Sequence, residues 1–247
     1  MKVNDKPILL LLALCFAMAC GPVSSAPADP ETPQSSTEKR VPLAGGALSE
    51  EVQHIADWAV HSGDNKGMPF IIVDKVQARA TAFDRTGKLL RSTPILIGMG
   101  VGDVFEPGVL QMDMHETKPS QRITPAGRYV AEENMNLAGE RVLWIDYDAG
   151  IALHKMPAKK TSQRRHERMR SSNPADHRIT YGCINVPPAF YDQVVRANFR
   201  AKGGIVYVLP DSAPAQAVFK SYDVGERRVS SAAEAGADRI PPQMQRF

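Results

Sequence analysis

Between about residue 68 and residue 210, the chain is a succession of short β-rich runs broken by turn residues. Phe70 to Lys75 and Ala78 to Asp84 are two such runs, and a turn at 85–88 separates the second from the run that starts at Leu89. Short runs rich in β-branched and aromatic residues, bounded by Gly, Pro, Asn and Asp, are typical of strands. We therefore expect a mainly β region, long enough to bury one sizeable core.

Helices flank these runs at a few places. Further strands are expected at 129–132, 141–146, 150–154 and 205–209. Within residues 48–67, a helix is expected from the N-cap Ser49 to Gly63, because apolar residues recur at helical spacing. A second helix is expected from Pro187, since proline is tolerated in a first helical turn, to a point before Gly203. The tail, 211–247, has little to bury and is expected to be poorly ordered.

The N-terminal residues indicate where the protein is targeted. Lys2 and Lys6 precede an apolar run that is too short to span a bilayer, which indicates a signal peptide over 1–19. Residues 20–47 are rich in Pro and Ser and are expected to form a disordered linker. The end of the signal fits either simple secretion or lipidation of Cys20. We expect a periplasmic or cell-envelope protein, with a lipid anchor in the second case.

One cysteine, Cys183, lies in the part expected to fold, and its setting favours a reactive thiol. Gly182 before it and Pro187 after it place the thiol on a turn before a short helix. A lone cysteine can be a small buried residue, but an unpaired thiol in an exported protein is a liability unless it is used. Because the thiolate is the nucleophile, a neighbouring base is needed, and His154 at the end of a strand is the candidate.

These residues resemble the L,D-transpeptidase (YkuD-type) catalytic domain of bacterial cell-wall enzymes. The family shows a strand-ending His, a loop, then Ser/Thr-x-Gly-Cys, an apolar residue and Arg or Asn, and this chain has Leu153-His154 and Thr180 to Asn185. A second match is Ile123 to Tyr129, where the family commonly has Thr-Pro-x-Gly before an aromatic strand residue. The resemblance covers roughly residues 68–210 and implies an L,D-transpeptidase-like β-sandwich.

The resemblance also implies a two-step acyl transfer on peptidoglycan stem peptides. Cys183 would attack the amide after the third residue of a stem tetrapeptide, and an amine would resolve the thioester, with His154 as general base. The backbone amides of Tyr181, Gly182 and Cys183 would form the oxyanion hole. Positions that the family uses to order the site or to bind substrate are occupied by Asn185, Arg178 and Thr180.

This chain departs from the family pattern at three points, which leaves rival functions open. Tyr181 stands where His is frequent, and the interval of 29 residues from His154 to Cys183 is longer than usual. Lys155 replaces a small residue, which puts the backbone contact to the imidazole in doubt. An L,D-peptidase or amidase with water as acceptor, and a non-catalytic envelope binding module, are the alternatives. The sequence does not indicate the oligomeric state.

The positive charge is concentrated in an insert, 155–178. The whole chain carries a net charge of +3, too little to indicate nucleic-acid binding, whereas the insert has eight basic and two acidic residues. We expect either a cationic lid that attracts carboxylates or a solvated loop without function. No cofactor is expected, and no metal either, because the spacing of His154, His166, His177 and Cys183 fits no ordinary metal site.

Overall fold

The computed structural model describes residues 48–158 and 163–227. The predicted signal peptide, the linker and Cys20 lie outside the described residues, as does the tail from 228. In the described ranges, no helix combines the length and the hydropathy that crossing a bilayer requires.

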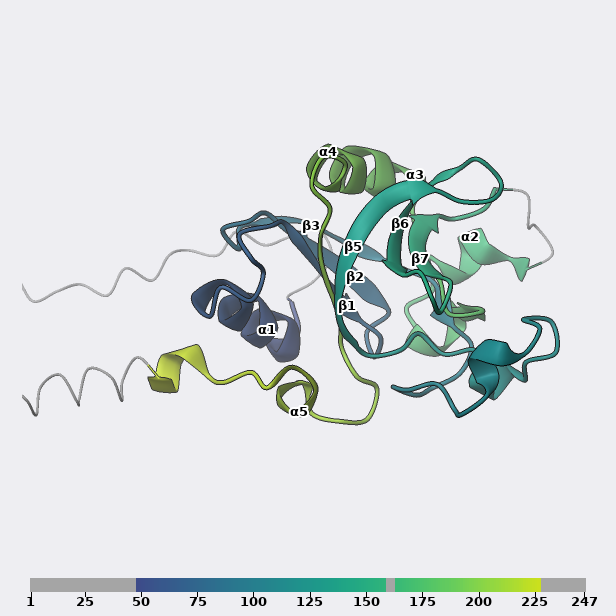
Figure 1. The fold of residues 1–247 in the computed structure, drawn as a ribbon, viewed down its shortest axis with the longest axis horizontal. Helices are drawn as coiled ribbons and strands as arrows, with labels where there is room; N and C mark the ends of the chain where they lie inside the picture. Colours follow the sequence, from purple (N-terminus) through teal and green to yellow (C-terminus); the bar gives the residue numbers. More distant parts are fainter. Residues whose placement is uncertain (1–47, 159–162, 228–247) are drawn as a thin grey trace, which may run out of the picture. The chain divides into compact units, whose positions relative to one another are not determined.

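Eight strands form one continuous sheet in the order β3-β2-β1-β10-β5-β6-β7-β9 (Figure 1). Their bounds are β1 Phe70–Asp74, β2 Arg79–Phe83, β3 Leu89–Pro94, β5 Gly127–Met135, β6 Arg141–Asp146, β7 Ile151–Lys155, β9 Ile184–Val186 and β10 Gly204–Val208. A small parallel pair consists of β4 (Ile97–Gly98) and β8 (Arg178–Thr180). The strands predicted from the β-rich runs are thus present.

Strand β5 joins the two halves of this sheet. Its residues 127–131 pair with β10, whereas its residues 132–135 pair with β6. The halves enclose a common core, in which Ile71 and Val73 of β1 pack with Leu143 of β6 and Leu153 of β7. Two halves facing each other across a shared core make a β-sandwich, which confirms the predicted fold class.

The central strands β1 and β10 are buried on both faces. Their alternate side chains enter the sandwich core, and the others, such as Phe70 and Tyr207, pack under α1 (Glu50–His61) and α5 (Ala215–Phe219). Figure 1 shows these two helices on the same side of the sheet. Burial on both faces explains why the sequences of β1 and β10, which run parallel, are almost continuously apolar.

The predicted helices begin where the sequence indicates. The hydroxyl of Ser49 accepts a hydrogen bond from the Val52 amide, which caps α1. After Pro187 the chain forms α3 (Pro188–Phe190), a π-helical stretch η5 (Tyr191–Val195) and α4 (Arg196–Phe199). Shorter helices lie in the loops: η1 Val109–Gln111, η2 Pro119–Gln121, α2 Arg165–Arg168 and η4 Pro174–His177.

The expectation of low order from residue 211 is wrong for residues 211–227. The side chain of Asp211 is 2% exposed and forms ion pairs. Phe219 of α5 is buried, and its ring lies edge-on to Tyr207 at 5.7 Å between centroids. These contacts come from residues spaced too widely to form an apolar run, so the sequence pattern did not reveal them.

Candidate active site

Two neighbouring strands bring the candidate nucleophile and base to one side of the sheet. Strands β7 and β9 run parallel, and their register pairs His154 with Asn185. Cys183 lies two residues before Asn185, on the turn between β8 and β9. Because side chains alternate along a strand, His154, Asn185 and Cys183 point to the same side. The two residues that the sequence separates by 29 positions therefore share one site.

The turn that carries Cys183 is braced by two threonines. Thr180 Oγ1 accepts a hydrogen bond from the Gly182 amide at 3.1 Å and donates one to the Cys183 carbonyl oxygen at 2.6 Å. Thr124 Oγ1 donates to the Gly182 carbonyl oxygen at 2.8 Å and accepts from the Gly98 amide at 3.0 Å. The backbone around Cys183 is thereby fixed from both sides.

Gly182 is the residue type that this turn requires. Its φ is +133°, a conformation that L side chains rarely adopt. A Cβ atom at this position would lie 2.6 Å from the Ile123 carbonyl oxygen and 2.6 Å from Ile151 Cδ1. The Gly that precedes the cysteine is thus explained by close packing against the segment containing Thr124.

This bracing changes the roles expected for two residues of the motif. Thr180 is buried, and its hydroxyl bonds within the turn, so it braces the turn and is not a substrate-binding residue as expected. The Gly182 amide is engaged by Thr180 and does not face a ligand. Of the three amides expected to form an oxyanion hole, those of Tyr181 and Cys183 are retained in the proposal below.

His154 is held by hydrogen bonds at both ring nitrogens. Nδ1 lies 2.9 Å from the Lys155 carbonyl oxygen, so replacing the family's small residue by Lys155 does not remove the backbone contact. Nε2 lies 3.0 Å from Asn185 Nδ2. Asn185 is 1% exposed, and its Oδ1 accepts a hydrogen bond from Nη1 of Arg165, which is 6% exposed. Asn185 therefore contacts the base, and it orders the site.

The Cys183 thiol lies in surroundings that favour its protonated form. Sγ is 3.5 Å from the Gly150 carbonyl oxygen. Burial raises the pKa of Cys183 above its ordinary value, and this effect exceeds the lowering by the Ala152 amide and the Arg165 charge. A base is therefore needed to generate the thiolate at neutral pH.

Tyr181, which replaces the family's frequent His, contacts the long loop between β4 and β5. The Arg122 guanidinium lies 4.0 Å from the centroid of the Tyr181 ring, and the His115 ring lies edge-on to it at 6.1 Å. A cation over an aromatic face contributes about 0.5–1 kcal/mol at exposed sites and more when desolvated. The phenol ring thus helps to hold this loop beside the cysteine turn.

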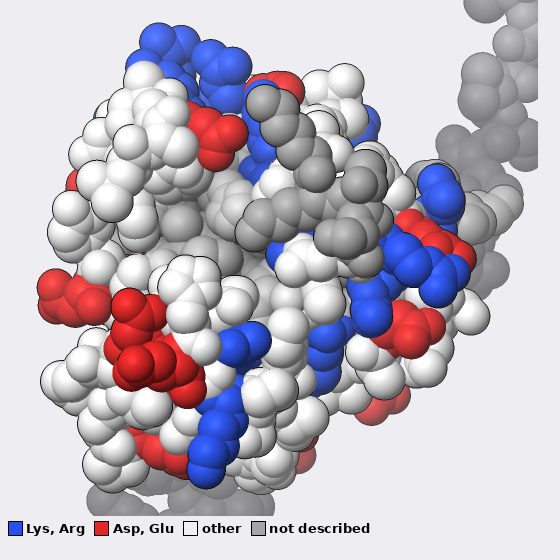
Figure 2. Space-filling view, turned by 90° about the vertical axis from the view of Figure 1, so that its right-hand side faces the viewer, with Lys and Arg blue, Asp and Glu red and all other residues white. Residues whose placement is uncertain are grey.

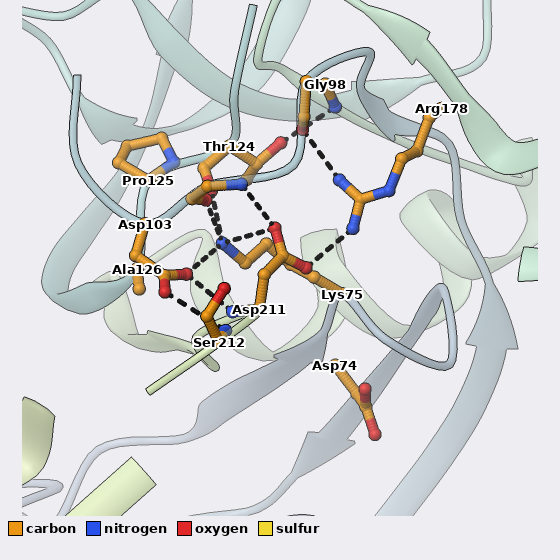
Figure 3. Close-up of polar contacts among 12 residues, drawn as sticks. Asp74, Lys75, Gly98, Asp103, Thr124, Pro125, Ala126, Arg178, Asp211 and Ser212 are labelled. Carbon is orange, nitrogen blue, oxygen red and sulfur yellow. Dashed lines mark hydrogen bonds and ion pairs between the residues drawn. The ribbon is translucent and has the colours of Figure 1, made fainter. Parts of the chain in front are cut away.

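A buried ion-pair network lies on the other side of Thr124 (Figure 3). Lys75, which follows β1, has a fully buried side chain, and its Nζ lies 2.9 Å from Asp103 Oδ1 and 3.3 Å from Asp211 Oδ2. The same ammonium donates to the carbonyl oxygens of Gly102 and Thr124, at 2.6 and 3.0 Å. Lys75 therefore fixes the backbone of the residue whose hydroxyl braces Gly182.

Arg178 belongs to this network. Its guanidinium donates to Asp211 Oδ1 at 2.6 Å and to the Gly100 carbonyl oxygen at 2.8 Å, and Figure 3 shows it approaching Asp211 from the side opposite Asp103. Because both contacts are internal, the expected substrate-binding role of Arg178 gives way to a structural one. It ties β8, which leads into the cysteine turn, to the segment after β10.

The described part of the insert is anchored to the domain, and some of its charges are paired. Arg165 is buried, Arg164 pairs with Glu167, and Lys155 pairs with Asp192 at 2.8 Å. Figure 2 shows Lys and Arg interspersed with Asp and Glu over the described part of the face that it presents. His177, also buried, has its two ring nitrogens 2.7 and 3.0 Å from carbonyl oxygens of Ile95 and Ser171. Residues 163–178 are thus folded against the domain, with Arg164 and Arg170 exposed, and a role in attracting carboxylates stays a prediction.

Within residues 48–158 and 163–227, no three His, Cys, Asp or Glu side chains are grouped as a metal site would require. His166 is exposed, whereas His177 is buried against carbonyl oxygens of the insert and of the segment before β4. The histidines of the insert therefore do not gather around Cys183.

Two residues that shape this site are not apparent from the sequence. The one signal for Lys75 is that a lysine ends an otherwise apolar run. Arg165 is one of the basic residues of the insert, and nothing in the sequence distinguishes it from Arg164 next to it. Only the fold shows which of the two adjacent arginines is buried.

Comparison with known protein families gives one match. Residues 68–207 match the family described as the L,D-transpeptidase catalytic domain (YkuD). No curated protein matches the chain in sequence.

Solved structures that are similar to parts of the chain have low identity. An L,D-transpeptidase from Xylanimonas cellulosilytica is 15% identical over 57% of this chain and 60% of its own, with a TM-score of 0.37. L,D-transpeptidase 1 of Mycobacterium tuberculosis is 14% identical over 57% and 61%, with a TM-score of 0.32. The helical cell shape determining protein Pgp2 of Campylobacter jejuni is 17% identical over 59% and 49%, with a TM-score of 0.38. The chain thus spans about 60% or less of these proteins.

Proposed function

Because the chain belongs to the L,D-transpeptidase catalytic domain family, we propose that it is an exported cysteine acyltransferase that modifies peptidoglycan. The observation that carries the proposal is the pairing of β7 with β9, which presents His154 and Cys183 on one side of the sheet. The braced turn and the hydrogen bonds of His154 add a fixed geometry for nucleophile and base.

The first half of the proposed reaction forms a thioester. Cys183 Sγ attacks the carbonyl carbon between the third and fourth residues of a stem tetrapeptide, while His154 Nε2 takes the thiol proton. The amides of Tyr181 and Cys183 stabilise the oxyanion, and losing one such donor costs on the order of 100-fold or more in rate. The C–N bond then breaks, and His154 returns the proton to the amine of the departing D-alanine.

The second half transfers the acyl group. The amine of an acceptor stem peptide attacks the thioester carbon, and His154 takes a proton from that amine. The C–S bond breaks, the sulfur leaves as thiolate, and the proton on His154 restores the thiol. With water as acceptor, the same steps yield a shortened peptide instead of a cross-link.

Mass spectrometry of disaccharide-tetrapeptide fragments incubated with the purified protein tests this proposal. Transfer gives a cross-linked dimer with loss of one D-alanine, and hydrolysis gives a tripeptide. Cys183→Ala should give neither product and should retain the fold, because the turn is held by Thr124, Thr180 and Gly182. Unchanged fragments with the parent protein would instead favour a binding module.

The proposed location is the cell envelope, with Cys20 as lipid attachment site. Cell fractionation of the full chain and of a Cys20→Ser variant tests this. A lipidated protein should be in the membrane fraction and should move to the soluble fraction in the variant. If both proteins are soluble in the periplasm, simple secretion is correct.

A further inference from the structure

The side chain of Asn185 lies between a base and a buried cation. Its Nδ2 is 3.0 Å from His154 Nε2, and its Oδ1 accepts a hydrogen bond from Arg165 Nη1. Asn185 is 1% exposed and Arg165 is 6% exposed, so water does not readily replace either partner. A second hydrogen bond, from Arg165 Nε to Gln163 Oε1 at 2.6 Å, fixes the guanidinium itself.

The donor and acceptor chemistry of these groups permits one arrangement. A guanidinium has only donors, so the Asn185 oxygen must face Arg165 and the Asn185 NH2 group must face His154. His154 Nε2 then has to be the unprotonated nitrogen of the ring. At the other end, the Lys155 carbonyl oxygen can only accept, so the proton must be on Nδ1. Both ends of the ring indicate the same tautomer.

We propose that Arg165, acting through Asn185, is the positioning residue that holds His154 as the Nδ1–H tautomer with an Nε2 lone pair. This inference rests on the proposed acyl transfer for its purpose: once the hydrogen bond from Asn185 to Nε2 gives way, the same lone pair takes the thiol proton of Cys183. The insert thereby gains a role that its net charge does not indicate: it contributes the buried guanidinium of Arg165, which acts on His154 through Asn185.

The same contacts oppose protonation of His154 at rest. An imidazolium would direct Nε2–H at the Asn185 NH2 group, and turning the amide would direct NH2 at Arg165. In either arrangement two hydrogen-bond donors face each other, so one buried contact of the Asn185 amide is lost. A proton taken from Cys183 is therefore held weakly and passes readily to the leaving amine.

Other charged residues line a cavity beside His154, and several of them are paired with one another. Among the described residues, the Arg165 guanidinium and the Cys183 thiol interact with each other, and Arg165 reaches His154 through Asn185. A cavity that His154 also lines contains Glu140, Arg141, Lys155 and Arg196. Lys155 and Arg196 both pair with Asp192, and Arg141 and Arg196 lie near Glu133. Substitutions at Arg165 and Asn185 leave the residues that line this cavity unchanged, but loss of the Arg165 charge also raises the pKa of the Cys183 thiol, so the NMR measurement is needed beside the pH–rate profile.

The test combines a pH–rate profile with nitrogen NMR of the imidazole, using the parent and three variants. Arg165→Met removes the cation at similar length, Arg165→Lys keeps a donor-only cation, and Asn185→Asp replaces the NH2 donor by an acceptor while Arg165 stays. We expect the acidic limb of kcat/KM to move up by about one pH unit in Arg165→Met and further in Asn185→Asp. Arg165→Lys should restore part of the difference.

The NMR measurement does not depend on turnover. In 15N-histidine-labelled protein, the His154 signals, identified by their absence in His154→Gln, should show a protonated Nδ1 and an unprotonated Nε2 in the parent. Arg165→Met should give a mixture of tautomers, and Asn185→Asp should favour the imidazolium. Arg170→Met is the matched control, because Arg170 is an exposed arginine of the same insert, and it should behave like the parent.

The outcomes separate the two proposals. A parent that shows the Nδ1–H tautomer, lost in both Arg165→Met and Asn185→Asp, supports the positioning role even if no peptidoglycan fragment is converted. An active parent whose His154 carries its proton on Nε2, or whose tautomer and acidic limb are unchanged in Asn185→Asp, overturns it while the proposed function stands. If Arg165→Met fails to fold, Asn185→Asp decides alone.

Discussion

The hydroxyl of Thr124 donates a hydrogen bond of 2.8 Å to the carbonyl oxygen of Gly182, the residue before the candidate nucleophile. In a trans peptide the carbonyl and the following N–H point in opposite directions. Fixing the Gly182 carbonyl toward Thr124 therefore directs the Cys183 amide away from Thr124. This bond connects the two sequence motifs of the chain, Ile123 to Tyr129 and Thr180 to Asn185, in one structural unit.

Thr124→Val should impair the chemical step more than it impairs the fold. The isosteric change leaves the Gly182 carbonyl and the Gly98 amide without their partner, and each unsatisfied buried group costs about 1–3 kcal/mol. A turn displaced by even about 1 Å loses on the order of 100-fold in rate. Urea denaturation and kcat on a tetrapeptide measure the two effects.

Thr81→Val is the matched control for this prediction. Thr81 is also buried, and its hydroxyl bonds to Ser92 on β3, far along the sheet order from the cysteine turn. It should lower stability and leave the kcat of the folded protein unchanged. Equal kcat in Thr124→Val and the parent would show that the bond does not position the turn.

The reactivity of Cys183 should depend steeply on pH. Because burial raises the pKa of this thiol, the protonated form dominates at neutral pH, and the thiolate fraction increases as pH rises toward that raised pKa. Alkylation of Cys183 by iodoacetamide should be slower at pH 7 than that of the same residue in urea-unfolded protein.

Arg165→Met should slow the alkylation of Cys183 further, since the Arg165 charge lowers the pKa of this thiol. Peptide mass mapping distinguishes Cys183 from the other cysteines, and faster reaction in the folded parent at pH 7 would contradict the prediction.

The fold could be predicted because local pattern determines its elements, and motif spacing placed His154 and Cys183 as candidates on neighbouring strands. The short runs give the strands, Ser49 and Pro187 give the helix starts, and the Gly182-Cys183 pair has a conformation that requires glycine. Positions that contact each other only through the tertiary fold could not be predicted. Arg178 looks like a substrate ligand in the sequence, yet Asp211, 33 positions away, binds it internally.

The behaviour of the insert could not be derived from its charge. A count of basic residues cannot distinguish a solvated arginine from one that enters the domain, and Arg164 and Arg165 differ in this way. His177 anchors the insert through hydrogen bonds to backbone carbonyl oxygens, and the sequence does not indicate which carbonyl groups a histidine contacts. The tail after residue 211 was misjudged for a similar reason, because its burial rests on isolated residues such as Phe219.

Lys75→Met should destabilise the protein strongly. It removes the cation between Asp103 and Asp211 and leaves the carboxylate of Asp211, which is 2% exposed, with Arg178 as its ion-pair partner and the Gly102 amide as a hydrogen-bond donor. Breaking a buried ion pair by removing one partner costs about 3–5 kcal/mol. Urea denaturation measures this loss, and Lys202→Met, at an exposed lysine, should change the free energy of unfolding by less than about 0.5 kcal/mol. A similar small change in Lys75→Met would mean that the network adds no net stability.

The same network should make the protein sensitive to acid. Burial acts to raise the pKa of Asp103, but hydrogen bonds from Lys75 and from the Asp211 amide outweigh it and lower that pKa below 3.8. A carboxyl whose pKa is lower in the folded state contributes stability above its unfolded pKa, and this contribution is lost as pH falls through the folded value. The parent should therefore lose stability below about pH 4, and Asp103→Asn should flatten that loss. Parallel stability curves for parent and variant between about pH 5 and pH 2 would assign the acid sensitivity to other groups.

Reversing charges in the insert should give two different results, depending on which arginine is changed. Arg164 and Arg170 are exposed, so Arg164→Glu with Arg170→Glu breaks the surface pair of Arg164 with Glu167 and changes the field met by an approaching anionic substrate. This pair should lower kcat/KM modestly at low salt, leave kcat unchanged, and converge with the parent near 1 M salt, where the Debye length is about 3 Å. Arg165→Glu places a carboxylate against Asn185 Oδ1 and should reduce kcat at every salt concentration. Stopped assays at several salt concentrations decide between these roles. If Arg165→Glu loses only kcat/KM, and only at low salt, Arg165 is one more steering charge. If Arg165→Glu loses kcat equally at every salt concentration, Arg165 acts on His154.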